Sequence, residues 1–224
     1  MKKKRSMKTK LFLFAILILG STGIYLIFLA KPAKCTQGNC RNGTGQLTYS
    51  VQKYYKGEFK NGRQHGFGIF KDEKGNRYEG DWQNGKKHGF GTFQYARGEK
   101  YEGFYYKGKK SGQGTYTWND GTKLSGTWRN GEPEGKGVVT LSGKLEMHGE
   151  YRGGTIYNGA GIYIYDNDNR YVGQWKEGKR HGAGILLNNK GKILQSGMWQ
   201  QNKLIEEKTL NNGNSNKNQK QTQK

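Results

Sequence analysis

The chain has little of what builds an ordinary globular core. Of its 224 residues only two are Pro and two are Cys, and hydrophobic residues make up 32%. Much of the aliphatic content also falls in one run, residues 11–30. With 37 Gly and so many aromatic residues, the scarcity of Pro excludes collagen, and the aromatics exclude a flexible Gly/Ser linker. A conventional thick core is not expected, and the composition favours tight turns joining short aromatic strands.

Acidic residues are scarce too, with 17 Asp and Glu against 39 Lys and Arg, for a net charge of +22. The excess is uneven along the chain. Residues 1–34 carry eight basic residues and no acid, residues 204–224 carry four Lys and two Glu, and the middle is mixed in sign. The charge therefore favours anionic partners without specifying one.

The N-terminus predicts attachment to a membrane. A basic leader at 1–10 precedes twenty uncharged residues, 11–30. Twenty helical residues cover the hydrocarbon core of a bilayer, about 30 Å. The run is longer than the apolar part of most cleavable signals, so we expect a transmembrane helix that stays as an anchor, with a cleaved signal as the alternative. The basic leader predicts a cytoplasmic N-terminus and a chain that then faces the periplasmic or extracellular side.

The only two cysteines, Cys35 and Cys40, follow this run directly. In an oxidising compartment they could close a small disulfide loop. Unpaired thiols remain the alternative, and without a third and fourth ligand nearby a zinc site is poorly supported. No metal or cofactor site is predicted elsewhere.

The middle of the chain is a repeat. YKGEFKNGRQHGFGIF from Tyr55 is followed 23 residues later by YEGDWQNGKKHGFGTF from Tyr78. Further copies start at Tyr101, Leu124, Met147 (with one inserted residue) and Tyr171, and a broken copy starts near Gln195. Within a unit, Tyr-x-Gly-x-Trp alternates as a strand does, and Asn-Gly is a strong signal for a hairpin turn. Bare glycines allow a ring or another backbone to approach closely. Each unit is thus predicted to be one β-hairpin that is stable only when stacked on its neighbours.

The pattern YxGxWxxGxxxGxG resembles the MORN (membrane occupation and recognition nexus) repeat, over residues 55–203. Departures are Leu124 and Met147 at the first position, other aromatics at the Trp position, and Asn202 at the last turn glycine. The resemblance implies an all-β, single-layer antiparallel array of hairpins with a grooved face. It also implies scaffolding, protein interaction and, in some members, association with acidic lipids. Residues 31–54 are then a linker with the Cys pair and a partial repeat, and residues 204–224 a polar disordered tail.

Features that suggest chemistry belong to the repeat. His65, His88 and His181 recur at one position, whereas a catalyst needs a unique set of partners. The Gly-Lys stretch of the second unit, NGKKHG, lacks the Ser/Thr that follows the Lys of a phosphate-binding loop, and it precedes a predicted strand rather than a helix. No enzymatic site is predicted.

The basic residues after the turn glycine are of more interest, and they occupy equivalent positions: Arg63, Lys86, Lys87, Lys109, Lys110, Lys179 and Arg180. They predict a charged rim along one edge of the array. The rim is either a set of solvated hairpin tips that protect the sheet or a contact surface for anionic lipid or an envelope polymer. We expect no nucleic-acid partner, because the aromatics are needed for packing. The sequence thus predicts a non-catalytic, membrane-anchored scaffold for an unidentified protein partner, with binding of acidic lipid or an anionic envelope polymer as the alternative.

Overall fold

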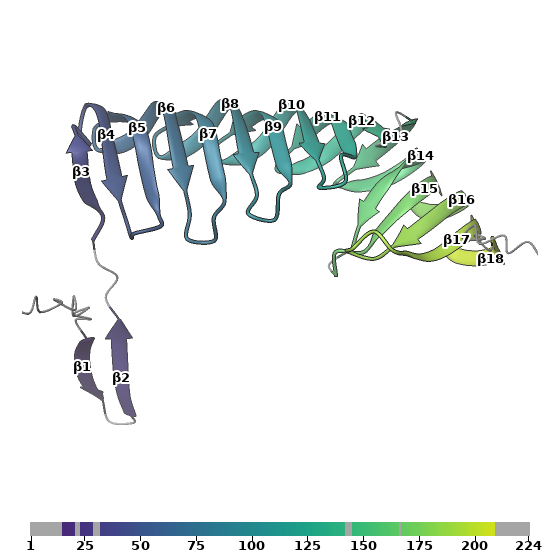
Figure 1. Ribbon diagram of the computed structural model, residues 1–224, viewed down its shortest axis with the longest axis horizontal. Helices are drawn as coiled ribbons and strands as arrows, with labels where there is room; N and C mark the ends of the chain where they lie inside the picture. Colours follow the sequence, from purple (N-terminus) through teal and green to yellow (C-terminus); the bar gives the residue numbers. More distant parts are fainter. Residues whose placement is uncertain (1–14, 21–22, 29–31, 142–144, 166, 209–224) are drawn as a thin grey trace, which may run out of the picture.

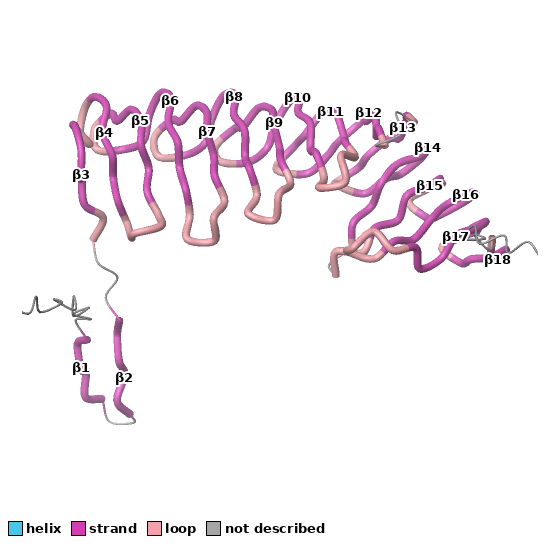
Figure 2. The backbone as a smooth tube through the Cα atoms, in the orientation of Figure 1, coloured by secondary structure: helices cyan, strands magenta, loops and turns pink. Residues whose placement is uncertain are grey.

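The computed structural model describes residues 15–20, 23–28, 32–141, 145–165 and 167–208. All of the secondary structure in these residues is β-strand. Sixteen strands form one antiparallel sheet in strict sequence order, so each strand pairs only with its neighbours along the chain. The sheet is a single elongated layer (Figure 1). Its tube view shows hairpin after hairpin along the length of the array (Figure 2).

The strands of the sheet are β3 Lys34–Gly38, β4 Gly43–Thr48, β5 Tyr54–Lys60, β6 Arg63–Lys71, β7 Arg77–Gln83, β8 Lys86–Gln94, β9 Lys100–Tyr106, β10 Lys109–Thr117, β11 Lys123–Arg129, β12 Glu132–Thr140, β13 Glu146–Arg152, β14 Thr155–Ile164, β15 Arg170–Lys176, β16 Lys179–Leu187, β17 Ile193–Gln200 and β18 Lys203–Glu207. The all-β hairpin array expected from the sequence is confirmed. Pairing also includes β3 and β4 before the first full repeat, and β18 after the last.

Two-residue turns close the hairpins, and both residues of each turn have positive φ. Asn84 has a φ of 50° and Gly85 one of 78°, the geometry in which Asn-Gly is favoured. The N–H of Gly85 donates to the carbonyl of Gln64 in the preceding unit, at 3.0 Å. Equivalent bonds recur at every later turn up to Asn202, which donates to Arg180 at 3.1 Å. The turns therefore close each hairpin and also join it to its neighbour.

The core is a stripe of aromatic rings along one side of the sheet, here called the aromatic face. Tyr78 is fully buried and Trp82 is 8% exposed, although no second layer of described residues covers them. The Tyr78 ring contacts Trp82 of its own unit at 5.2 Å between centroids, and Tyr105 of the next unit at 5.2 Å. Both contacts are edge-to-face, a favoured aromatic arrangement. The stripe therefore joins neighbouring units as well as the two strands of one hairpin.

Glycine makes this burial possible. A Cβ added to Gly91 would lie 2.4 Å from the Tyr78 hydroxyl oxygen and within 2.7 Å of two ring carbons. The ring thus lies directly over the backbone of the opposite strand, and its hydroxyl donates to the carbonyl of Asp81 at 3.0 Å. In the next contact along, Trp82 Nε1 donates to the carbonyl of Gly68 in the preceding unit, at 3.2 Å. These two buried polar atoms are satisfied by backbone, as burial requires.

The array bends near β13 and β14 (Figure 1). In the ordinary units the glycine of the first strand pairs with the second glycine of Gly-x-Gly, as Gly80 does with Gly91. In the fifth unit Gly149 instead pairs with Gly159, the first glycine of that motif. The inserted residue changes the register, Ile156 fills the core, and Trp175 Nε1 is left without a hydrogen-bond partner.

The predicted transmembrane helix over residues 11–30 is not found. The described parts of that segment form a separate antiparallel hairpin, β1 Ala15–Gly20 and β2 Gly23–Phe28, with Gly20 paired to Gly23. Its isoleucines favour strand over helix, and glycine weakens a helix interior. No helix within the described residues is long and apolar enough to cross a bilayer. The leader at 1–10 and the rest of the tail after Lys208 lie outside the described residues.

Replacing Gly91 with Ala should lower the free energy of unfolding by roughly 3 kcal/mol, because the methyl group has no space under the Tyr78 ring. The matched control is Gly62→Ala, where an added Cβ meets nothing within 4 Å and only the positive φ of 72° is strained. That control should cost about 1 kcal/mol. Urea denaturation followed by tryptophan fluorescence measures both, and equal losses would contradict the packing role of Gly91.

Candidate binding groove on the aromatic face

One residue of each second strand lies directly opposite the buried aromatic that ends Tyr-x-Gly-x-Trp. We call this set the facing column, and it consists of Gln64, Lys87, Lys110, Pro133, Ile156, Arg180 and Leu204. Because a pair of residues directly opposite each other projects to the same side of the sheet, the column lies on the aromatic face. Three of its members are cations.

Lys87 and Lys110 extend over aromatic rings. Lys87 Nζ lies 4.1 Å from the centroid of Phe93, 5.2 Å from Tyr78 and 5.5 Å from Tyr105 in the next unit. The Lys110 ammonium is enclosed more fully, and its four ring distances are 4.6 Å to Trp128, 4.7 Å to Tyr116, 4.8 Å to Tyr101 and 5.7 Å to Tyr95. These distances are in the range of cation–π attraction.

Arg180 repeats the arrangement in the sixth unit. Its guanidinium carbon is 4.2 Å from the centroid of Trp199, and a guanidinium nitrogen donates to the carbonyl of Asn202 at 2.8 Å. Arg180 is therefore tied to backbone, whereas neither lysine ammonium forms an ion pair with a described carboxylate.

Burial lowers the pKa of both lysines to about 8, from 10.5. The charges of Asp72 and Glu132 pull the other way, on Lys87 and Lys110 respectively, without offsetting the loss of hydration. The positive charge of Lys87 further lowers the pKa of Lys110. Burial thus destabilises the charged form of both lysines, and a bound anion would stabilise it.

The predicted basic rim is not one surface. Arg63, Lys86, Lys109 and Lys179 begin their strands and are exposed, whereas Lys87, Lys110 and Arg180 are half-buried on the aromatic face. Consecutive residues of a strand point to opposite sides, so the two halves of each Lys-Lys pair separate. We call the exposed set the outer cations.

A hollow of about 500 Å³ lies beside Lys110 on the aromatic face. Half-buried rings form much of its wall, from Tyr95, Tyr116, Trp118 and Tyr163. Glu132 and Pro133 lie at the turn end, and Lys110 is the only cation among the lining residues described. The hollow thus extends the surface around Lys87 and Lys110 from the third unit into the fifth, and we call this combined surface the groove.

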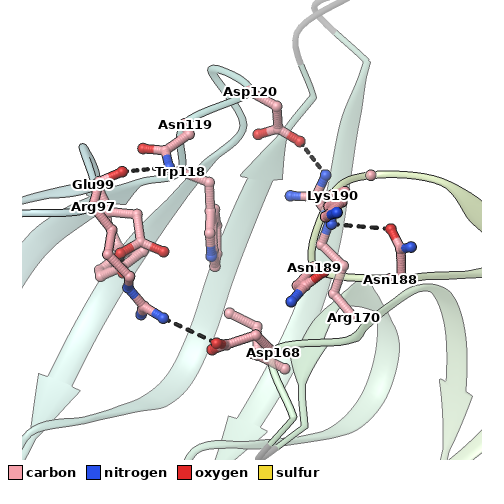
Figure 3. Close-up of a pocket in the computed structure, with 13 residues that line it drawn as sticks. Arg97, Glu99, Trp118, Asn119, Asp120, Asp168, Arg170, Asn188, Asn189 and Lys190 are labelled. Atoms are coloured by element: carbon pink, nitrogen blue, oxygen red, sulfur yellow. Dashed lines mark hydrogen bonds and ion pairs between the residues drawn. The ribbon is translucent and has the colours of Figure 1, made fainter.

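A second hollow, of about 590 Å³, lies on the inside of the bend between loops of distant units (Figure 3). Arg97 forms an ion pair with Asp168 at 2.9 Å, and Arg170 pairs with Asp120. The charges on its wall are thus largely paired with one another. We infer that these two ion pairs, which join loops of distant units, help to hold the bend.

The repeated histidines do not form a site. His65 and His181 each have a buried Nδ1 without a hydrogen-bond partner, and His88 packs against Tyr106 with ring centroids 5.4 Å apart. Among the described residues there is no group of three or more His, Cys, Asp or Glu side chains that could hold a metal. Cys35 and Cys40 are joined by a disulfide, with their Cα atoms 5.9 Å apart, at the start of the sheet.

Comparison with protein families identifies the repeat. The family model described as MORN repeat matches residues 55–77, 78–100, 101–123, 125–143 and 171–192. The chain carries MORN repeats. The model leaves out residues 144–170, which contain the hairpin with the altered register.

Other comparisons add little to the MORN assignment. No curated protein sequence matches the chain. Among solved structures, the TCP10 domain of Danio rerio CPAP in complex with a peptide of Danio rerio STIL is 13% identical. It covers 83% of this chain and 100% of its own, with a TM-score of 0.29, too low to support an inference.

Replacing Lys87 and Lys110 together with Met should raise the melting temperature at pH 7, since two half-buried charges are removed while most of the side-chain packing is kept. Between pH 8 and 9 the unfolded protein keeps protons that the folded lysines release, so the natural protein should gain stability as pH rises. The variant should lose that gain. Thermal denaturation by circular dichroism measures it, with the exposed Lys86→Met as control. The same slope in all three proteins would contradict the pKa assignment.

Replacing Arg97 and Arg170 with Ala should open the bend. Small-angle X-ray scattering should then show a larger radius of gyration. The loss of stability should be about 1 to 2 kcal/mol, because the Arg97–Asp168 pair is exposed whereas the Arg170 side chain is only 17% exposed. The control is Arg129→Ala, an exposed residue at the end of β11. An unchanged radius would show that the altered register alone sets the bend.

Proposed function

We propose that the MORN array is a non-catalytic scaffold that binds an extended segment of a partner protein along the aromatic face. The observation that carries this proposal is the hollow lined by Tyr95, Tyr116 and Trp118, continuous with the facing column. Aromatic side chains are enriched where proteins bind one another, because they offer a large contact area at low entropic cost. A single-layer sheet leaves this face without a covering layer of its own.

The repetition of the groove favours binding over catalysis. Each unit places a buried aromatic and a facing-column residue at equivalent positions, so contacts add along the array. Four of the six units add a half-buried ring near the end of the second strand: Phe70, Phe93, Tyr116 and Tyr163. A catalytic centre would require a set of groups found once. The charged groups found once, at the bend, are largely paired with one another.

The outer cations support an alternative, the binding of anionic lipid or an anionic envelope polymer. Arg63, Lys86, Lys109 and Lys179 are exposed and lie at the start of second strands. The first three are in successive units, where two strands per unit space them by roughly 10 Å. Lysine at such positions also keeps a sheet from pairing with another sheet. This second role is enough to explain them, so the alternative ranks below protein binding.

Membrane attachment remains part of the proposal, on the strength of the sequence. Twenty uncharged residues after a basic leader supply enough apolar surface to hold the chain at a bilayer. The array would then lie on the periplasmic or extracellular side. Extraction of membranes at alkaline pH, followed by N-terminal sequencing of the retained chain, tests both attachment and cleavage. Release of the full-length chain would refute attachment.

The protein-binding proposal is tested by placing a photo-crosslinking amino acid at Tyr116 in the groove, or at Phe104, which is 48% exposed, on the opposite side of the sheet. In cells that make the protein naturally, the Tyr116 site should give a discrete crosslinked product that Trp118→Ala weakens. The Phe104 site should give none. Crosslinking from Phe104 alone would place the partner on the wrong face.

A vesicle experiment separates the alternative. Cosedimentation with phosphatidylserine vesicles that is abolished by Lys86→Glu with Lys109→Glu, and without any product at Tyr116, would favour lipid binding. These two lysines are the appropriate ones to reverse, because a carboxylate at position 87 or 110 would be buried among rings and would disrupt folding.

A further inference from the structure

Two half-buried cations on the aromatic face have no ion-pair partner among the described carboxylates. Lys87 and Lys110 occupy equivalent positions in neighbouring units, and both ammonium groups lie within reach of aromatic rings. No described carboxylate pairs with either one. An unpaired charge removed from water costs free energy, and cation–π contacts offset only part of it.

The fold does not need a charge at this position. Elsewhere in the facing column the chain has Pro133, Ile156 and Leu204, which pack against the same kind of aromatic. Packing alone therefore does not require lysine at positions 87 and 110. A negatively charged ligand would form an ion pair with each ammonium group and so offset the free energy lost when that group is removed from water.

The segments 1–14 and 209–224 have no acidic side chain that could supply that negative charge. Residues 1–14 contain six Lys and Arg and no acidic residue, and residues 209–224 contain three Lys and no acidic residue. Either end would be repelled from the groove. Charge complementarity thus points to another molecule.

The spacing of the two lysines restricts the ligand further. Equivalent positions in neighbouring units are two strands apart, about 9.6 Å at 4.8 Å per strand. A polyproline II helix has three residues per turn and rises about 3.1 Å per residue, so residues i and i+3 lie on one side about 9.3 Å apart. In an extended β-strand residues i and i+3 would point in opposite directions.

We propose that Lys87 and Lys110 bind an acidic linear segment of a partner protein, in polyproline II conformation, through carboxylates at residues i and i+3. The segment runs along the array, across the strands, and its other residues contact Phe93, Tyr116 and Trp118. The proposal rests on the protein-binding function above and specifies its ligand.

A membrane fits this site less well than a peptide does. Lipid headgroups form a flat surface that suits the exposed Lys86 and Lys109 on the other side of the sheet, whereas the lysines of the groove are half-buried between rings. A slender chain can enter the groove and bring its carboxylates to the ammonium groups. Grooves lined with aromatics also suit polyproline II segments, which lose little entropy on binding.

The test uses two peptides of identical composition that carry a neutral dye. Gly-Pro-Glu-Pro-Pro-Glu-Pro-Gly places its carboxylates three residues apart, and Gly-Pro-Pro-Glu-Glu-Pro-Pro-Gly places them side by side. Fluorescence anisotropy with the full-length chain in detergent should show tighter binding of the first peptide. Lys87→Met and Lys110→Met should each weaken it about tenfold, the size expected for one charge-assisted contact. The matched controls Lys86→Met and Lys109→Met should leave it within twofold.

The outcomes distinguish the acidic-segment proposal from the protein-binding proposal on which it rests. Equal binding of the two peptides, binding that survives the double Met variant, or no binding of either peptide overturns the acidic-segment proposal. If a crosslinked partner still forms at Tyr116, protein binding stands with a different ligand. Loss of phosphatidylserine vesicle binding in the double Met variant, without peptide binding, would assign the two lysines to lipid and overturn the proposal as well.

Discussion

The fold depends on one contact, an aromatic ring lying on bare glycine. Because Gly91 has no side chain, the Tyr78 ring packs directly on the backbone of the neighbouring strand. The Tyr78 hydroxyl donates to the carbonyl of Asp81 in its own strand. Edge-to-face contacts with Trp82 and with Tyr105 of the next unit then enclose the ring. A single-layer sheet obtains fully buried residues in this way without a second layer to cover them. The high glycine content and the low aliphatic content have the same origin.

The same contact explains why cations survive on the aromatic face. Rings that stand edge-to-face present their faces to the space above the facing column, where Lys87 and Lys110 extend. The electron-rich ring faces partly replace the water that each ammonium loses. They do so incompletely, since the pKa of each lysine remains depressed to about 8. An array built from aliphatic residues could not hold these charges, and an array with a second layer would cover them.

The sequence predicted the features that depend on local chemistry. Asn-Gly turns, hairpins of alternating residues and close approach at Gly-x-Gly each follow from a few adjacent residues. The separation of Lys86 from Lys87 could have been inferred from strand alternation, but equivalent positions in the repeat were taken to share one edge. The bend was not predicted, because the inserted residue in the fifth unit signals a change without its direction. Residues 11–30 were ambiguous, since an apolar run rich in isoleucine suits a strand as well as a helix, and only interactions outside the segment decide between them.

Since each unit contacts chiefly its neighbours, binding preferences can vary unit by unit while the scaffold stays the same. The aromatic residues of Tyr-x-Gly-x-Trp and the glycines on which their rings pack are needed for the fold, and so they cannot vary freely. The facing column can, and it runs from Gln64 through two lysines to Pro133, Ile156 and Arg180. In the straight part of the array its charge is concentrated in the second and third units and ends at Pro133, before the bend. Arg180 adds a third cation beyond the bend, where it also donates to a backbone carbonyl. A segment that follows the straight part of the groove would therefore meet its cations first and the aromatic hollow next. This order assigns charge recognition to one end of the ligand and apolar recognition to the other, and it gives the groove a direction.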